Sequence, residues 1–107
     1  MTANFQAAVS GGLGNTASGQ WSNVSGGVNN EAMGSRSSVA GGDGNTAVGE
    51  DSSVVGGFSN MATGVQSSVG GGALNDAMAL NSTVSGGNDR DATDTDDWVG
   101  GGLTEDN

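Results

Sequence analysis

A valine returns every fifteen residues along this chain, from Val9 to Val99, always among the same small and polar residues. Two glycines follow each valine after one intervening residue, as in Gly41–Gly42. An asparagine comes six residues after the valine in five copies, and an alanine comes eight residues after it in six copies. A fixed period of this kind indicates a repeat architecture, in which each unit stacks on the next.

Within each unit the constant residues are spaced by two, which is the spacing of side chains on one face of a β-strand. One short strand is predicted at Ser-x-Val-x-Gly, as in residues 37–41, and a second at Asn-x-Ala-x-Gly, as in residues 45–49. The residues between them are predicted to turn, because glycine and asparagine tolerate positive φ. The predicted fold is therefore all-β: a β-solenoid, or parallel β-roll, of 15-residue coils with two short strands per coil.

The constant positions are predicted to face inward and to form a thin core of small side chains. The simpler interpretation of the asparagines is that they are turn residues, and the alternative is a ladder of stacked amides. The predicted core consists of Val9, Val24, Val39, Val54, Val69 and Val84, of Asn15, Asn30, Asn45, Asn60 and Asn75, and of Ala17, Ala32, Ala47, Ala62 and Ala77.

Several large apolar residues fall at the outward positions of this scheme. A lone thin coil would expose them to water, whereas two or more chains packed side by side would bury them. The alternative is that they are scattered surface residues, which are common on soluble proteins. The candidates for an oligomer interface are Met33, Val48, Val55, Phe58 and Met78.

Composition narrows the functions that this array can have. Only 33% of the 107 residues are hydrophobic, which alone would suggest disorder, but the strict period overrides that interpretation. The net charge of −10 disfavours nucleic acids and anionic membranes as partners, and no apolar run approaches the ~18 residues of a membrane span. The chain has no histidine, cysteine or lysine, so we expect no enzyme, and the sequence offers no catalytic, cofactor-binding or metal-binding residues.

The two ends depart from the period. Residues 1–8 are predicted to form an N-terminal cap, with Phe5 covering the first coil, residues 9–88 the repeat β-roll, and residues 89–107 an acidic C-terminal cap. Five aspartates lie within nine residues of the last segment, which makes the loop from Asp89 to Asp97 a candidate for calcium binding. A solvated acidic loop is the favoured interpretation, because the spacing does not match the pattern of an EF-hand.

Residues 7 to 87 resemble the head repeats of trimeric autotransporter adhesins. The resemblance is carried by units such as Ser52-Ser53-Val54-Val55-Gly56-Gly57-Phe58-Ser59-Asn60-Met61-Ala62-Thr63-Gly64. It implies a left-handed parallel β-roll, three chains packed around a threefold axis, and binding to host matrix proteins or to other cells. The unit departs from the family, whose repeats commonly have fourteen residues and a larger aliphatic residue near the second glycine, and no neck, stalk or membrane anchor is visible.

We therefore expect a non-enzymatic adhesive head, a homotrimer if the resemblance holds, that binds a host or cell-surface protein or glycan. Its expected location is extracellular, on a cell surface or a virion. The alternative is a structural segment of a fibre, spike or filament, such as a phage tail or a cell appendage. Ice binding is disfavoured, because it needs a regular row of threonines, whereas the row before the alanines reads Thr16, Glu31, Thr46, Met61 and Asp76.

Overall fold

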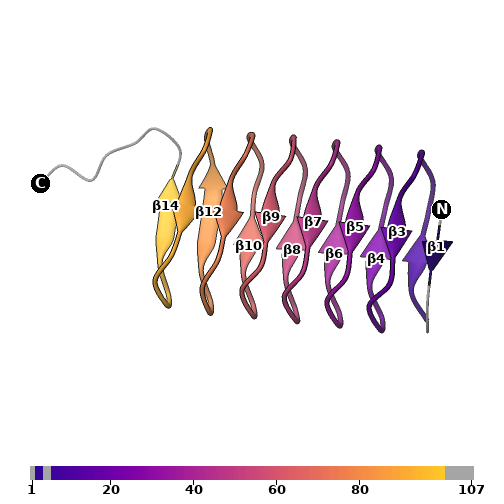
Figure 1. Ribbon diagram of the computed structural model, residues 1–107, viewed down its shortest axis with the longest axis horizontal. Helices are drawn as coiled ribbons and strands as arrows, with labels where there is room; N and C mark the ends of the chain where they lie inside the picture. The colour runs from indigo at the N-terminus through magenta and orange to yellow at the C-terminus, as the bar shows by residue number, and fades with distance from the viewer. Residues whose placement is uncertain (1, 4–5, 101–107) are drawn as a thin grey trace, which may run out of the picture.

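The computed structural model describes residues 2–3 and 6–100, and these residues form one β-solenoid of coils about fifteen residues long (Figure 1). Every coil contributes one strand to each of two seven-stranded parallel sheets. The described residues contain no helix. The predicted all-β solenoid with two short strands per coil is thus confirmed.

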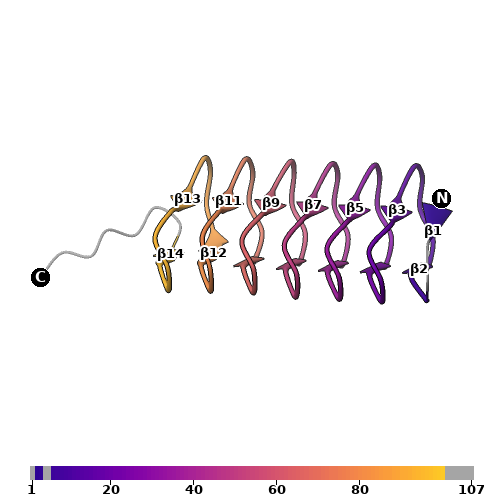
Figure 2. The ribbon, with the colours of Figure 1, turned by 60° about the horizontal axis from the view of Figure 1, so that its bottom comes forward.

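The odd-numbered strands make one sheet, called sheet A, and the even-numbered strands make the other, sheet B; Figure 2 shows the strands of sheet A in a row. Sheet A contains β1 (Thr2–Ala3), β3 (Thr16–Ala17), β5 (Glu31–Ala32), β7 (Thr46–Ala47), β9 (Met61–Ala62), β11 (Asp76–Ala77) and β13 (Asp91–Ala92). Sheet B contains β2 (Ala8–Val9), β4 (Asn23–Val24), β6 (Ser38–Val39), β8 (Ser53–Val54), β10 (Ser68–Val69), β12 (Thr83–Gly86) and β14 (Trp98–Gly100).

Neighbouring strands pair at a spacing of fifteen residues, so identical positions of the repeat stand directly above one another. Ala47 pairs with Ala62, and Val54 pairs with Val69. The spacing falls to fourteen residues at two places near the ends, where Ala3 pairs with Ala17 and where Gly86 pairs with Gly100 after a register shift. Parallel bridges between Leu13, Val28, Asp43, Phe58, Ala73 and Asn88 add a third row of pairing along one turn. The strand register therefore stacks equivalent positions of the repeat along the axis of the solenoid.

The core is narrow because the residues that meet inside it are small. The valines and alanines at the constant positions of the repeat are essentially inaccessible to water: Val24, Val39, Val54, Val69 and Val84, and Ala17, Ala32, Ala47, Ala62, Ala77 and Ala92. Val9, at the first coil, is only half-buried and packs against this cluster. Burial of many valine methyl groups, rather than of a few large side chains, is the apolar contribution to the stability of this fold.

The asparagines are buried and link successive coils through their side chains. Asn45 Nδ2 donates to the carbonyl oxygen of Gly41 in its own coil at 2.9 Å and to that of Gly57 in the next coil at 3.0 Å. Its Oδ1 accepts the backbone N–H of Asn60 at 2.9 Å. The same three bonds recur at the other repeat asparagines. The side chains therefore bond to backbone, so the ladder is not one of amide to amide, and their burial exceeds that of an ordinary turn residue.

Buried serines close the other turn of each coil. The hydroxyl of Ser52 donates to the carbonyl oxygen of Gly49 at 2.6 Å, and Ser22, Ser67 and Ser82 do the same three residues back. Among the described residues, Ser37 differs, because its buried hydroxyl has no hydrogen-bond partner. The bonded serine hydroxyls therefore stabilise the turn through its backbone.

The second glycine of each pair is required by the backbone. Gly57 has φ of 96°, and a Cβ there would collide with the carbonyl oxygen of Gly72 in the next coil. A Cβ on Gly56, one residue earlier, would meet no atom within 4 Å. The stacking of coils thus explains the strict recurrence of the second glycine, since only glycine combines this φ with so close an approach of two backbones.

The coils extend beyond the range predicted for the repeat. Strand β1 pairs with β3, and β13 and β14 continue both sheets as far as Gly100, although these residues lie in the segments predicted to be caps. Phe5, expected to cover the first coil, lies outside the described residues, as do residues 101–107. Whether the two ends act as caps stays a prediction.

Candidate interaction surface

The outer face of sheet A carries two rows of side chains that run along the axis of the solenoid. The row that follows the buried alanines is called the methionine row and contains Ser18, Met33, Val48, Thr63, Met78 and Thr93. The row that precedes the alanines is called the mixed row and contains Thr16, Glu31, Thr46, Met61, Asp76 and Asp91. Met33 and Met78 are each 47% exposed and Met61 is 38% exposed, so this face presents large apolar side chains to its surroundings.

The outer face of sheet B is built from smaller residues. One row contains Ala8, Asn23, Ser38, Ser53, Ser68, Thr83 and Trp98, and the other contains Ser10, Ser25, Ala40, Val55, Gly70, Ser85 and Gly100. The large apolar residues exposed on this face are Val55, in the middle, and Trp98, in the last described coil. The Nε1 of Trp98 donates to the hydroxyl of Ser85 at 2.7 Å, which holds the indole against sheet B.

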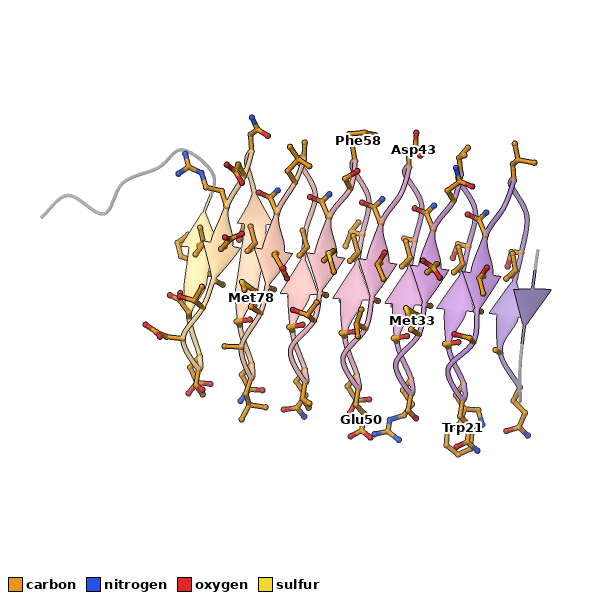
Figure 3. All side chains as sticks on the ribbon, in the orientation of Figure 1. Trp21, Met33, Asp43, Glu50, Phe58 and Met78 are labelled. Atoms are coloured by element: carbon orange, nitrogen blue, oxygen red, sulfur yellow. The ribbon has the colours of Figure 1, made fainter. Side chains whose placement is uncertain are left out.

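The two turns form the edges of the flat solenoid, and both carry exposed apolar residues. Figure 3 places Phe58 and Asp43 on one edge and Trp21 and Glu50 on the other, with Met33 and Met78 between them. Leu13, Val28 and Leu74 lie on the same edge as Phe58, and Val65 and Leu80 on the same edge as Trp21.

Two of these edge residues occupy a backbone conformation that suits glycine or asparagine. Leu74 has φ of 58°, at a position held in the other coils by Gly14, Asn29, Gly44, Ser59 and Asp89. Trp21 also has φ of 58° in the opposite turn. A bulky residue there costs roughly 1–2 kcal/mol. Both side chains are about half exposed, so burial does not offset this cost within a single chain.

The five residues predicted to form an oligomer interface do not lie on one surface. Met33, Val48 and Met78 share the methionine row of sheet A, whereas Val55 lies on sheet B and Phe58 on a turn. Met61 is exposed on the same sheet as the methionine row but is not among the residues predicted from sequence. Its position one residue before an inward alanine is the signal that could have found it, because residues on either side of an inward residue share the outer face.

An ion-pair cluster lies on the edge of Trp21. The guanidinium of Arg36 donates to both carboxylate oxygens of Asp51, at 2.6 Å and 3.0 Å, and lies 3.5 Å from Glu50. The hydrogen bond from Arg36 lowers the pKa of Asp51, and the same bond raises the pKa of Arg36. All three side chains are exposed, so this cluster organises the edge more than it stabilises the fold.

A second acidic site lies on the mixed row. Asp76 pairs in register with Asp91 on the next strand and accepts a hydrogen bond from the hydroxyl of Thr63 at 3.0 Å. Partial burial raises the pKa of Asp76; the bond from Thr63 opposes this shift and the charge of Asp91 adds to it. The fold therefore disfavours the ionised form of the Asp76 carboxyl group.

The acidic loop from Asp89 to Asp97 is the candidate for calcium binding. Among residues 2–3 and 6–100, no three acidic side chains come together in a way that could hold a metal ion. Four buried serine hydroxyls, such as that of Ser52, donate to backbone carbonyls, and that of Ser37 has no hydrogen-bond partner.

Comparison with known protein families and with curated proteins identifies no relative of this chain: no protein-family model matches the sequence, and a search of curated proteins finds no significant match. In the part of the chain that the structure describes, there is no helix long and apolar enough to cross a membrane.

Proposed function

We propose that this protein is a non-enzymatic adhesive rod that acts as an oligomer, with the outer face of sheet A packed against copies of the same chain. The observation that supports this function is the exposure of Met33, Val48, Met61 and Met78 along one face of a rigid coil. Exposed apolar residues gathered on one face mark association sites more often than chance scatter does. The resemblance to adhesin heads implies three copies and a location on a cell or virion surface.

In this proposal the surfaces that remain free bind the target. Sheet B and the turns would stay accessible to a host or cell-surface protein or to a glycan. Trp21 is the best candidate for a contact residue there, because an exposed indole provides a large contact area at low entropic cost. No step in this function requires a metal ion, a cofactor or a nucleic acid.

The test of oligomerisation compares matched charge substitutions on the two faces. Met33→Asp with Met78→Asp would place carboxylates on sheet A, and Ser38→Asp with Thr83→Asp would place them on sheet B near the same coils. We expect sedimentation equilibrium to show an oligomer for the wild type and the sheet B variant, and a monomer for the sheet A variant. A wild-type chain that is monomeric at every concentration would refute the oligomer.

The test of adhesion uses immobilised matrix proteins and a glycan array. We expect specific retention that is weakened about tenfold or more by Trp21→Ala, as for a central aromatic contact, and is unchanged by Val55→Ala. Circular dichroism of both variants checks that the solenoid is intact. Absence of retention on every surface protein and glycan would argue against an adhesin.

A second candidate is a structural segment of a fibre or filament. It is favoured by the parallel stacking of strands along one axis, because the same pairing could continue between chains placed end to end. Electron microscopy of concentrated protein would show linear polymers under this function and discrete particles under the first.

A further inference from the structure

The order of residues along the methionine row determines how copies can pack on sheet A. From the first coil to the last, the row reads Ser18, Met33, Val48, Thr63, Met78 and Thr93. Read from either end, the row has a small polar residue, then a methionine, then a β-branched residue. The row therefore has approximate two-fold character about the point between Val48 and Thr63.

A two-fold axis that lies in the interface and runs parallel to the strands would use this symmetry. It would make the two solenoids antiparallel and would place each row opposite the same row of the second copy. Met33 of one chain would then face Met78 of the other, and Val48 would face Thr63. The apolar side chains of one copy would meet those of the other along most of the row.

A parallel arrangement lacks this match. With a two-fold axis along the solenoid, the methionine row would face the mixed row of the second copy at the same height. Met33 would then face Glu31 and Met78 would face Asp76. Each methionine side chain would displace water from the carboxylate that it faces. The parallel packing therefore separates the methionines of the two copies and lacks the apolar contact between Met33 and Met78.

The distribution of charge also favours the antiparallel arrangement. Residues 6–30 contain no charged side chain, whereas residues 89–97 contain five aspartates and one arginine, a net charge of 1 − 5 = −4. Parallel copies, whether two or three, would hold these acidic coils next to one another. Antiparallel copies place each acidic coil beside an uncharged one, which removes that repulsion.

We propose that a second copy of this chain docks antiparallel on the outer face of sheet A, with Met33 of each copy against Met78 of the other. This inference rests on the proposed self-association and replaces three parallel copies with two antiparallel ones. It leaves an unfavourable contact that the two-fold axis repeats twice, because Glu31 of each copy faces Asp76 of the other. Asp76→Asn should therefore strengthen the dimer by a few fold in sedimentation equilibrium.

Cross-linking of cysteine variants tests the direction of the two chains, because the natural chain contains no cysteine. Met33→Cys chains and Met78→Cys chains are prepared separately and treated with a bis-maleimide that spans about 10 Å, the spacing of sheets packed face to face. In the antiparallel dimer, two copies of residue 33 are offset by three coils, or about 14 Å along the axis. We expect a strong cross-link only when the two variants are mixed.

The controls make each outcome decisive. Ser38→Cys mixed with Thr83→Cys tests sheet B near the same coils and should give no cross-link. A two-chain mass with the mixed cross-link supports the proposal. Cross-linking of Met33→Cys to itself, or a three-chain mass, would overturn the antiparallel dimer and leave the adhesive oligomer standing. A monomer in every measurement would overturn both.

Discussion

The two sheets of this solenoid share one backbone plan but carry different residues on their inner and outer sides. On the inner side of sheet A, Asn45 and its equivalents make buried hydrogen bonds beside small alanines, and the outer side carries methionines. On the inner side of sheet B, buried valines lie beside buried serines such as Ser52, and the outer side carries mostly small, uncharged residues. Sheet A thus has amides on its inner side and both large apolar side chains and carboxylates on its outer side, whereas the described part of sheet B has neither methionines nor charges on its outer side.

This difference shows that the inner and outer sides of a thin coil answer to separate constraints. The inner side must satisfy buried backbone groups and fill a narrow space, and it repeats from coil to coil because every coil stacks on an identical neighbour. The outer side contributes little to that stacking, so its residues are free to serve contacts with other molecules. The large apolar residues on the outer face of sheet A are therefore the basis of the proposed contact with a second copy.

The largest expected effect is the loss of stability when a buried asparagine of sheet A is replaced. Asn45→Ala removes three hydrogen bonds and leaves the N–H of Asn60 buried without its partner. We expect a loss of about 4 kcal/mol in the free energy of unfolding, measured by urea denaturation. The control is Asn23→Ala on the outer face of sheet B, where the side chain makes one exposed bond to Ser25 and the loss should be below about 0.5 kcal/mol. Equal losses would remove the distinction between the inner and outer asparagines.

Replacement of a buried valine of sheet B should lower the free energy of unfolding by a smaller amount, through lost apolar burial instead of lost hydrogen bonds. Val54→Ala removes two methyl groups from a fully buried position of sheet B, which should cost about 2 kcal/mol through lost burial and a residual cavity. Val55→Ala, at the next residue, changes a side chain that is 60% exposed and should alter the free energy of unfolding by less than about 0.5 kcal/mol. If Val55→Ala proved as damaging as Val54→Ala, the assignment of inner and outer faces on sheet B would be wrong.

The buried serines offer a finer test within one row. Ser52→Ala removes the hydroxyl that bonds to the carbonyl of Gly49 and should cost about 1 kcal/mol. Ser37→Ala removes a buried hydroxyl that has no partner, so its effect should be close to zero or slightly stabilising. The two variants are measured side by side by thermal or urea unfolding, and the opposite ranking would contradict the hydrogen-bond assignment.

The smallest effect concerns the pH dependence of sheet A and of the adjoining edge. Because the pKa of Asp76 is raised in the folded chain, the folded state takes up this proton at higher pH than the unfolded state. Its contribution to stability is full below 3.8, the ordinary pKa of an aspartate, and is lost as pH rises through the folded value. In urea unfolding of dilute protein, Asp76→Asn should lack this loss.

Asp51 provides the opposite sign as a control. Its pKa is lowered by Arg36, so its contribution is present above 3.8 and is lost as pH falls through the lower folded value. Asp51→Asn should remove that loss at acid pH and leave the component from Asp76 unchanged. The same pH dependence in both variants would refute the assignment of these shifts to separate sites.

Much of the fold can be predicted from the period alone, because a repeat of fifteen residues with alternating small positions permits few stable stackings. The valines and alanines of the repeat are predicted to face the interior for this reason, and they are buried except for Val9 and Val99 at the two ends, which are partly buried. The candidate surface is less predictable. Val55 and Phe58 resemble the methionines as exposed apolar residues, but they lie on the other sheet and on a turn.

The sequence by itself thus determined the coil, its period and which residues alternate inward. When identical units stack, the spacing of residues along the sequence fixes which residues pair between neighbouring coils. Only the tertiary structure decided what the asparagines bond to, since their partners at Gly41 and Gly57 come from two different coils. It also decided which exposed residues share a face. Membership of a face depends on how the chain turns between strands, and a turn can place apolar residues that are close in sequence, such as Val55 and Phe58, on different surfaces.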